Sequence, residues 1–346
     1  MNENRSVTSV DVANLAGVSQ VTVSRTLSGK TSVSPKTKER VMEAVEKLGY
    51  RPNSAARAAR TGKTGNIGLL LSTVPGRSRL QSNFIRSIHH ELNHENLHLT
   101  LSIMDKEELS DETKFPKLLK DVLADGLICN YTHGIPPVVL NLIDRYQVPA
   151  VWVNTPMTYD CVLPDDRAAG KMATEHLISL GHRNIAYMGF AQSSHHSEQD
   201  RTTGYREAML EAGLPPRVQM MTTDRLIEKM RLTHDNRVGL CRSFLEAPDR
   251  PTAVVTYSMT VTEPLYVAAV GMGLGIPDDL SVVTIGDDLS NPFGFPFTTV
   301  LLSSEDLGRA AVRMVLRKLV KPGVKQTPVT IPPVLNIAAS SQKVSL

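Results

Sequence analysis

The sequence predicts an α/β protein with a three-helix domain at its N-terminus and a larger two-lobed domain built on parallel sheets. In residues 8–48, apolar residues recur at helical spacing between capping residues. From residue 66 onward, short apolar segments alternate with longer amphipathic ones, which is typical of parallel strands covered by helices. A length of 346 residues allows two or three compact units.

Residues 8–25, TSVDVANLAGVSQVTVSR, predict two short helices joined by a tight turn. Thr8 and Asp11 form a capping-box pattern, Gly17 ends the first helix, and Ser19 caps the second. The apolar positions of the pair are Val12, Ala13, Leu15, Ala16, Val23 and Leu27. In a helix-turn-helix, the first residues of the second helix meet base edges in the major groove of DNA. An ordinary helical hairpin is the alternative.

A third helix follows, because Ser34 is an N-cap and Pro35 suits the first helical position. Val41, Ala44, Val45 and Leu48 form one apolar stripe, and Gly49 stops the helix. Three helices can close a small core, which favours the DNA-binding interpretation.

The charge distribution supports the same interpretation. Residues 1–63 contain 11 Lys and Arg against 5 Asp and Glu, whereas the rest contains 27 against 30. A basic head on a slightly acidic body suits a polyanion at one end only.

The scattered Cys129, Cys161 and Cys241 have neither metal nor disulfide spacing, and no segment is a signal core or a membrane span. A cytoplasmic location is therefore expected.

Residues 11–57, DVANLAGVSQVTVSRTLSGKTSVSPKTKERVMEAVEKLGYRPNSAAR, resemble the DNA-binding head of the lac repressor/galactose repressor (LacI/GalR) family. The matching motifs include AGVS, TVSR and LGYRPN. The resemblance implies a homodimeric transcriptional regulator, expected to be a repressor, that binds a pseudo-palindromic double-stranded DNA operator and a small-molecule effector, expected to be a carbohydrate. It implies a helix-turn-helix domain at 1–50, a hinge at 51–63 and an effector-binding and dimerisation domain at 64–346.

Two residues at the start of the second helix are expected to read the operator. Gln20 can bond an adenine bidentately, and Val21 can touch a thymine methyl group. The neighbouring polar residues are expected to hold phosphates or the helix core; they are Ser19, Thr22, Ser24 and Arg25.

The hinge segment predicts a short helix from Ser54 to about Arg60 that Asn53 caps. By resemblance it docks in the minor groove at the dimer axis, where Arg57 and Arg60 suit the groove and its phosphates. Ala59 stands where the family places a leucine wedge. A methyl group buries less surface between bases, so we expect a weaker kink at the operator centre.

The body predicts two runs of strand and helix. The predicted strands are 66–72, 98–104, 125–130, 149–154, 184–189, 218–222, 252–257, 281–286 and 297–302, with a final extended stretch at 327–337. The predicted helices are 83–97, 113–124, 136–146, 165–180, 201–212, 236–246, 261–272 and 304–320. The resemblance, which extends to periplasmic sugar-binding proteins, implies three crossovers between lobes, with lobe one at 64–163 and 302–324 and lobe two at 164–301 and 325–340.

The natural ligand site is the crevice between two such lobes, at the ends of parallel strands. By resemblance, RTTGYREAM contains the arginine that grips the effector, Arg201; a surface arginine paired with Asp200 or Glu198 is the alternative. Polar residues after strands add further effector-binding candidates, which are Ser72, Asn130, Asn154 and Asp287 or, one place on, Asp288. Phe84, Tyr131 and Trp152 can stack on a sugar face or lie in the core.

The second lobe departs from the family pattern at three cleft positions. Ser258 and Met259 replace the usual Asn-Asp, and Leu302 replaces a polar residue. These changes leave a standard hexose effector in doubt.

The sequence predicts neither a catalytic nor a metal site, and no cofactor. His90, His94 and His98 recur at four-residue spacing, but His98 falls past the predicted helix end and no further ligand completes a zinc set. The Gly-rich segment 271–275 ends a helix and is therefore no dinucleotide-binding loop, and Asp165-Asp166 suits a helix N-cap better than a pair of catalytic carboxylates.

The rival interpretation is a two-lobed solute-binding or sugar-processing protein without a specific operator, which would need a signal peptide or a catalytic constellation.

Overall fold

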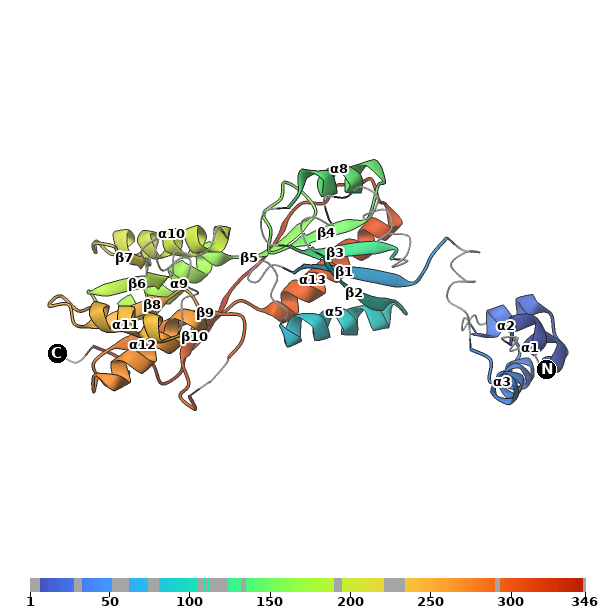
Figure 1. The fold of residues 1–346 in the computed structure, drawn as a ribbon, viewed down its shortest axis with the longest axis horizontal. Coiled ribbons are helices and arrows are strands. Elements are labelled where there is room, and N and C mark those ends of the chain that lie inside the picture. Colours follow the sequence, from blue (N-terminus) through green and yellow to red (C-terminus); the bar gives the residue numbers. More distant parts are fainter. Residues whose placement is uncertain are drawn as a thin grey trace. The chain divides into compact units, whose positions relative to one another are not determined.

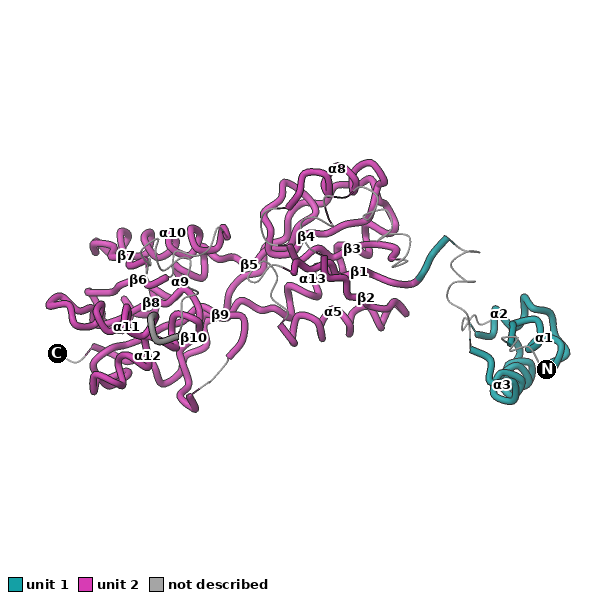
Figure 2. Tube along the Cα trace, in the orientation of Figure 1, with its two compact units in different colours: residues 1–64 teal, residues 65–346 magenta. Residues whose placement is uncertain are grey.

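The computed structural model describes residues 7–27, 33–51, 62–73, 81–104, 109, 111, 124–131, 135–189, 195–220, 234–289 and 293–344. The chain divides into two compact units, residues 1–64 and 65–346, which Figure 2 colours separately. The expected hinge helix, with Asn53, Arg57, Ala59 and Arg60, lies outside the described residues. So does nearly all of the helix predicted at 113–124.

The smaller unit contains three helices, α1 (Ser9–Ala16), α2 (Gln20–Leu27) and α3 (Pro35–Leu48). The predicted caps are confirmed. The Thr8 side chain accepts from the Asp11 amide in a complete capping box, and Gly17 ends α1 in the left-handed conformation that glycine adopts without strain. Ser34 caps α3, and Gly49 ends it in the same left-handed way.

The core of this unit is small and matches the predicted stripes except at one position. It consists of Val12, Ala13, Ala16, Val23, Val41 and Ala44. Leu15, which was predicted to face inward, is 45% exposed, because α1 buries the face that carries Val12, Ala13 and Ala16, and Leu15 lies beyond the edge of that face. Arg40 of α3 donates through Nη2 to the carbonyl oxygens of Ala16 and Gly17, which secures the end of α1.

The larger unit contains two six-stranded sheets (Figure 1). The first sheet is parallel throughout and has the order β11-β5-β4-β3-β1-β2. Its strands are β1 (Asn66–Ser72), β2 (His98–Met104), β3 (Gly126–Asn130), β4 (Ala150–Val153), β5 (Cys161–Pro164) and β11 (Val329–Ile331). It forms lobe one.

The second sheet has the order β12-β10-β9-β8-β6-β7 and is parallel except that β12 runs antiparallel to β10. Its strands are β6 (Ile185–Gly189), β7 (Arg217–Met220), β8 (Ala253–Thr256), β9 (Ser281–Gly286), β10 (Thr298–Leu301) and β12 (Val334–Asn336). It forms lobe two.

Helices cover both faces of each sheet. Lobe one has α5 (Ser82–His94) and α13 (Ser304–Val320) packed over one face and α8 (Pro137–Arg145) over the other. Lobe two has α9 (Asp166–Ser179) and α10 (His196–Glu211) on one face, with α11 (His234–Leu245) and α12 (Met259–Gly271) on the other. Because both faces are covered, the central strands are buried along their whole length, which explains their continuous apolar sequences.

The chain passes between the lobes three times: after β5, after β10 and after β11. The last passage was expected near residue 325, but it lies between Ile331 and Val334. The difference arises because β11 pairs in parallel with β5 and so still belongs to the sheet of lobe one.

Most predicted elements are confirmed, with two further differences. The strand β5 was not predicted, because CVLP is short and ends in proline. The helix α10 begins at His196 instead of residue 201. The three cysteines are free and buried, as expected. Among the described residues, none of the helices is both long and apolar enough to span a membrane.

Candidate functional site

The start of α2 presents the side chains that were expected to read DNA. Val21 is 59% exposed, which is unusual for an apolar residue on an eight-residue helix that packs its other face. Gln20 is exposed as well, and its Nε2 donates to the Ser9 hydroxyl at 2.8 Å, which ties the side chain to α1. Both side chains are therefore open to a ligand outside the helical unit.

The other candidates on α2 divide into capping and exposed residues. The Ser19 hydroxyl accepts from the Thr22 amide at 3.2 Å and lies 2.9 Å from the Thr22 hydroxyl, so this pair closes the first turn. Ser24 is half-buried and Arg25 is exposed near the end of the helix. Ser19 and Thr22 therefore stabilise the start of the helix, and the DNA contacts expected of these residues stay predictions.

A cavity of about 550 Å³ lies between the two lobes of the larger unit. Five of the predicted effector-binding residues line it: Phe84, Asn130, Asn154, Arg201 and Asp287. Asn130 ends β3, Asn154 follows β4 and Asp287 follows β9, so the carboxyl ends of the strands meet at the cavity, as expected for parallel sheets. Asp288, Ser258, Met259 and Leu302 line it too.

The structure places two other predicted residues elsewhere. Trp152 is buried in the core beneath α8, because alternate residues of β4 face opposite sides and its neighbours Val151 and Val153 take the side of α5 and α13. Tyr131 lies in the same core as Trp152. Ser72 is buried at the end of β1 and is not among the described residues that line the cavity.

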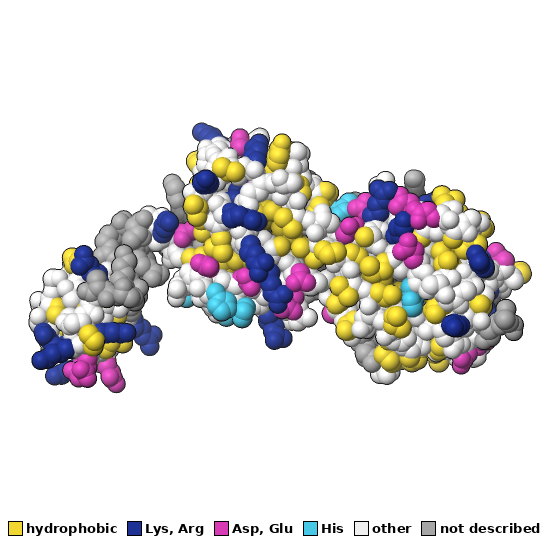
Figure 3. All heavy atoms as spheres, turned by 180° about the vertical axis from the view of Figure 1, so that it is seen from behind, with side chains coloured by type: hydrophobic (Ala, Val, Ile, Leu, Met, Phe, Trp, Pro, Cys, Tyr) yellow, Lys and Arg dark blue, Asp and Glu magenta, His cyan; other side chains and the backbone are white. Residues whose placement is uncertain are grey.

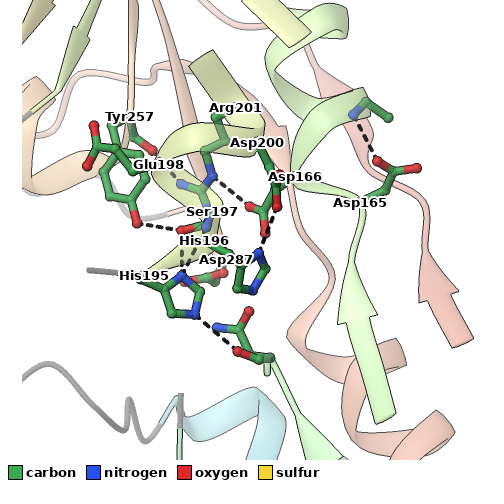
Figure 4. Close-up of polar contacts among 12 residues, drawn as sticks. Asp165, Asp166, His195, His196, Ser197, Glu198, Asp200, Arg201, Tyr257 and Asp287 are labelled. Atoms are coloured by element: carbon green, nitrogen blue, oxygen red, sulfur yellow. Dashed lines mark hydrogen bonds and ion pairs between the residues drawn. The ribbon is translucent and has the colours of Figure 1, made fainter. Parts of the chain in front are cut away.

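Arg201 is fixed by the protein on three sides (Figure 4). Its Nε donates to Asp166 Oδ1 at 2.7 Å, its Nη1 donates to the Tyr257 carbonyl oxygen at 2.5 Å, and its guanidinium lies 4.4 Å from the centre of the Tyr257 ring. The alternative of a surface pair with Asp200 or Glu198 is wrong. Arg201 is buried, and Asp200 instead accepts from His196 Nδ1 at 2.7 Å.

A chain of hydrogen bonds runs from Tyr257 to Asn154 along this wall of the cavity (Figure 4). His195 Nε2 lies 3.1 Å from the Asn154 carbonyl oxygen, and because a carbonyl only accepts, Nε2 carries a proton. Burial, with His196 beside it, lowers the pKa of His195 to about 4, so the ring is neutral and Nδ1 accepts from Ser197 Oγ (2.7 Å). Ser197 Oγ in turn accepts from Tyr257 Oη at 2.8 Å.

A second set of contacts links the lobes across the cavity. Gln81, which precedes α5 in lobe one, donates through Nε2 to Asp287 Oδ2 of lobe two. The Ser304 hydroxyl donates to Gln81 Oε1 and lies 3.2 Å from the Asp287 carbonyl oxygen. The Asp287 carboxylate thus accepts a hydrogen bond from the Gln81 amide. The next residue, Asp288, is exposed.

Sequence reasoning missed Gln81, His195, Ser197 and Ser304. His195 and Ser197 lie in a polar stretch that was interpreted as a loop, although Ser197 and Arg201 are four residues apart and share one helix face. Gln81 and Ser304 stand at helix starts, where their roles depend on a partner in the other lobe. No local pattern contains that information.

Glu198 is a buried acid beside Arg201 that lies behind the cavity wall. Its side chain is 8% exposed, and neither carboxylate oxygen has a hydrogen-bond partner in the described part of the chain. Burial raises its pKa to about 7, although Arg201 acts in the opposite direction.

Within the described ranges, no group of three His, Cys, Asp or Glu side chains is placed to hold a metal ion. His90 and His94 of α5 lie with Nε2 atoms 3.3 Å apart, while His98 begins β2. Figure 3 shows His side chains gathered beside Lys and Arg on this face. Arg309 and Arg313 lie 3.9 and 3.8 Å from the Glu91 carboxylate next to His90, and their charge disfavours a cation there.

Two family models match the chain. Residues 9–53 match the model of bacterial regulatory proteins of the lacI family, and residues 174–341 match the periplasmic binding protein-like domain. The first match covers the three helices of the smaller unit, and the second covers most of lobe two together with α13.

Relatives match over nearly the whole length. The HTH-type transcriptional regulator RegA of Clostridium saccharobutylicum is 30% identical over 316 residues, which cover 90% of this chain and 92% of that protein. The lac repressor dimer bound to operator and the anti-inducer ONPF is 23% identical with a TM-score of 0.78, covering 98% of this chain and 100% of that one. The complex of the transcriptional regulator CelR with cellobiose is 24% identical with a TM-score of 0.63, covering 96% and 99%. With this identity sustained through both units, the chain is a member of the LacI family of bacterial regulatory proteins.

Proposed function

We propose that this LacI-family regulator is a cytoplasmic, homodimeric repressor whose affinity for a pseudo-palindromic operator is set by a small molecule, carbohydrate in class, bound between the two lobes. One observation carries the proposal. The same chain has exposed side chains at the start of α2, Gln20 and Val21, and a polar cavity of about 550 Å³ between two lobes. A cavity of this size suits a small ligand.

The fold is compatible with each part of the proposal. One solved structure of this fold is a dimer bound to operator DNA, and another is a complex with cellobiose. A single three-helix head offers too small an interface for tight specific binding, so two heads and their hinge segments must act together on one operator. The effector acts by favouring one arrangement of the lobes, which requires that the two arrangements bind it with different affinity.

The test is operator selection followed by titration at several salt concentrations. Full-length protein selects sequences from a random DNA library, and fluorescence anisotropy then measures its affinity for selected and scrambled DNA. We expect a preference of about 10³-fold or more for the selected sequence, and a sugar that raises the Tm to change operator affinity about tenfold. Salt-dependent binding with no preference among sequences would instead support the two-lobed solute-binding alternative.

A further inference from the structure

Gln81 stands at the N-cap of α5, but its side chain makes no hydrogen bond to that helix. Short side chains such as those of Ser, Thr, Asp and Asn are preferred at an N-cap, because their oxygen atoms accept from the first amides of the helix. The longer Gln81 side chain instead donates through Nε2 to Asp287 Oδ2 of lobe two. A local contact at the start of α5 is thus replaced by a contact between the lobes.

The hydrogen bonds of Gln81 fix its amide group in one orientation. A carboxylate only accepts, so the amide nitrogen faces Asp287, and Gln81 Oε1 accepts from the Ser304 hydroxyl. Ser304 is 2% exposed, and its hydroxyl also lies 3.2 Å from the Asp287 carbonyl oxygen. All three residues line the cavity. We call this set of Gln81, Asp287 and Ser304 the clasp.

The clasp joins elements that belong to different lobes. Gln81 precedes α5 and Ser304 begins α13, and both helices pack on the sheet of lobe one. Asp287 follows β9, which lies in the sheet of lobe two. The bond between Gln81 and Asp287 must therefore break when the lobes separate. Because hydrogen bonds to a charged group are stronger than neutral ones, this bond favours the described arrangement of the lobes.

Asp287 also interacts with a charge of its own lobe. The guanidinium group of Arg201 on α10 attracts the Asp287 carboxylate electrostatically, and Asp287 is only half-buried. The acid therefore keeps favourable interactions after the clasp has opened. Breaking a contact in this way costs less free energy than leaving a buried charge without a partner. The clasp is consequently suited to open and to close.

Another contact between the lobes depends less on the residue types. His195 Nε2 donates to the backbone carbonyl of Asn154 at 3.1 Å, and any residue at position 154 would offer that acceptor. The clasp instead requires an amide at position 81 and an acid at position 287. Substitutions at these two positions therefore test the clasp and leave the groups of the other contact in place.

We propose that the clasp sets the equilibrium between two arrangements of the lobes, and that opening it changes operator affinity in the absence of any effector. The head connects to lobe one, because β1 follows the expected hinge in the sequence. An effector in the cavity acts by favouring either the closed or the open clasp. This inference rests on the proposed function, since it names the residues that regulate the same cleft.

The first test exchanges the donor and the acceptor of the clasp. Gln81→Glu places a second carboxylate against Asp287 and should open the clasp. Adding Asp287→Asn supplies an amide donor to the new acid, so the double variant re-forms the hydrogen bond with its roles reversed. We expect the single variant to increase the population of separated lobes about tenfold and the double variant to restore the original distribution.

Spin labels on the two lobes report their separation in the full-length protein by pulsed electron paramagnetic resonance. Asn141→Cys on α8 and Leu210→Cys on α10 provide exposed labelling sites, one on each lobe. The three natural cysteines are buried, so they do not compete for the label. Gln199→Glu makes the same amide-to-acid change at an exposed position of α10 outside the cavity and should leave the distances unchanged.

Operator affinity is the second readout, measured without sugar on DNA that the unsubstituted protein has selected. We expect Gln81→Glu to change this affinity about tenfold, the double variant to restore it, and Gln199→Glu to have no effect. Gln81→Met, which removes the amide without adding charge, replaces Gln81→Glu if that variant does not fold, and should shift both readouts in the same direction.

Unchanged lobe distances in the position-81 variants overturn the proposal, as does a double variant that stays as open as Gln81→Glu. A change in lobe distances without a change in operator affinity also contradicts it. Selection of DNA by the unsubstituted protein tests the proposed function separately. Failure of the clasp is therefore distinguishable from failure of the regulator itself.

Discussion

Glu198 occupies an unusual position for an acid, since it is buried on α10 three residues before Arg201 and its oxygens have no partner within the described residues. A Cβ atom on Gly189, the last residue of β6, would lie 2.2 Å from Glu198 Oε1, so the backbone of β6 closes over the carboxyl group. The absence of a side chain at Gly189 makes room for this acid. Its ionised form is disfavoured by the loss of water.

The pH dependence of stability should reveal Glu198. Because its pKa rises from 4.5 to about 7 on folding, the folded protein holds a proton that the unfolded chain releases, and stability falls as pH rises through this range. The loss at pH 8 is on the order of 3 kcal/mol, since a tenfold change in proton affinity corresponds to about 1.4 kcal/mol. Glu198→Gln should therefore gain stability relative to the natural protein between pH 5 and pH 8, as measured by urea unfolding.

Glu207→Gln is the matched control on the same helix. Glu207 is hydrogen-bonded to Arg167, which lowers its pKa, so its contribution is lost only as pH falls below about 4.5 and stays constant from pH 5 to pH 8. If the two variants followed the same pH profile, the assignment of the effect to Glu198 would be wrong.

At the level of single residues, the sequence identified cleft side chains that stand at strand ends. It missed side chains such as Gln81 and Ser304, whose hydrogen bonds reach a residue of the other lobe. Asn130, Asn154 and Asp287 follow apolar strands and line the cavity, so their position is a local property of the sequence. Ser72 also ends an apolar strand, yet it is not among the described residues that line the cavity. Trp152, a candidate for stacking on a sugar, lies inside β4, and the alternation of that strand turns it away from the cavity. The phase of that alternation depends on which helix covers each face.

Among the elements, the packing of α9 on α10 sets the geometry of the ion pair between Asp166 and Arg201. The two helices approach so closely that a Cβ on Gly170 would lie 2.0 Å from the Arg201 carbonyl oxygen, and one on Gly204 would lie 1.9 Å from the Arg167 carbonyl oxygen. Glycine is required at both positions because backbone, unlike the end of a side chain, cannot move aside. Asp166, the first residue of α9, is thereby held next to Arg201.

Gly204→Ala should push the two helices apart. We expect a loss of about 1–3 kcal/mol, typical of overpacking, and weaker effector binding because Arg201 moves away from Asp166. Gly239→Ala, on an exposed part of α11 with no atom within 4 Å of the new Cβ, should instead gain up to about 1 kcal/mol from helix propensity. Thermal unfolding of both variants gives the comparison; equal changes in Tm would contradict the close-packing argument.

Helices and strands were predicted correctly where the local sequence indicates them. Capping residues indicated the three helices of the head, and buried apolar runs indicated the central strands. The extended stretch at 327–337 was predicted correctly as extended, but it is two strands in two different sheets, β11 in one and β12 in the other. Pairing depends on distant partners, and the three-residue strands carry no signal for that choice.

For the whole molecule, the expected division of labour is that α2 chooses the sequence and the hinge adds affinity. Replacing Val21 by alanine should change which operator is preferred, because it removes a contact to a base edge. Replacing Arg57, which lies outside the described residues, should weaken binding to all sequences alike and reduce the salt slope by about one. Competition binding against a panel of operator variants at several salt concentrations measures both effects.

The unsubstituted protein and Lys47→Ala, in the last turn of α3, serve as references for that comparison. If the Val21 and Arg57 variants showed the same relative affinities across the operator panel, then base recognition by α2 and phosphate binding by the hinge would not be separate roles. The resemblance of residues 11–57 to one family supplied this division, whereas the order of crossings between lobes could not be obtained from apolar patterns alone.

The three passages between lobes also affect how the chain is made. The head is contiguous in sequence, so its three helices can pack as soon as Gly49 has been synthesised. Lobe one has no such independence, because Ala311, Val312, Met314 and Val315 of α13 belong to the core around β1, and β11 completes its sheet. Until α13 has been synthesised, to Val320, the apolar face of β1, β3 and β4 lacks the part of its cover that this helix provides. A nascent chain of this regulator therefore exposes part of that face while lobe two is being synthesised. We expect chaperones to bind the exposed apolar surface during that interval.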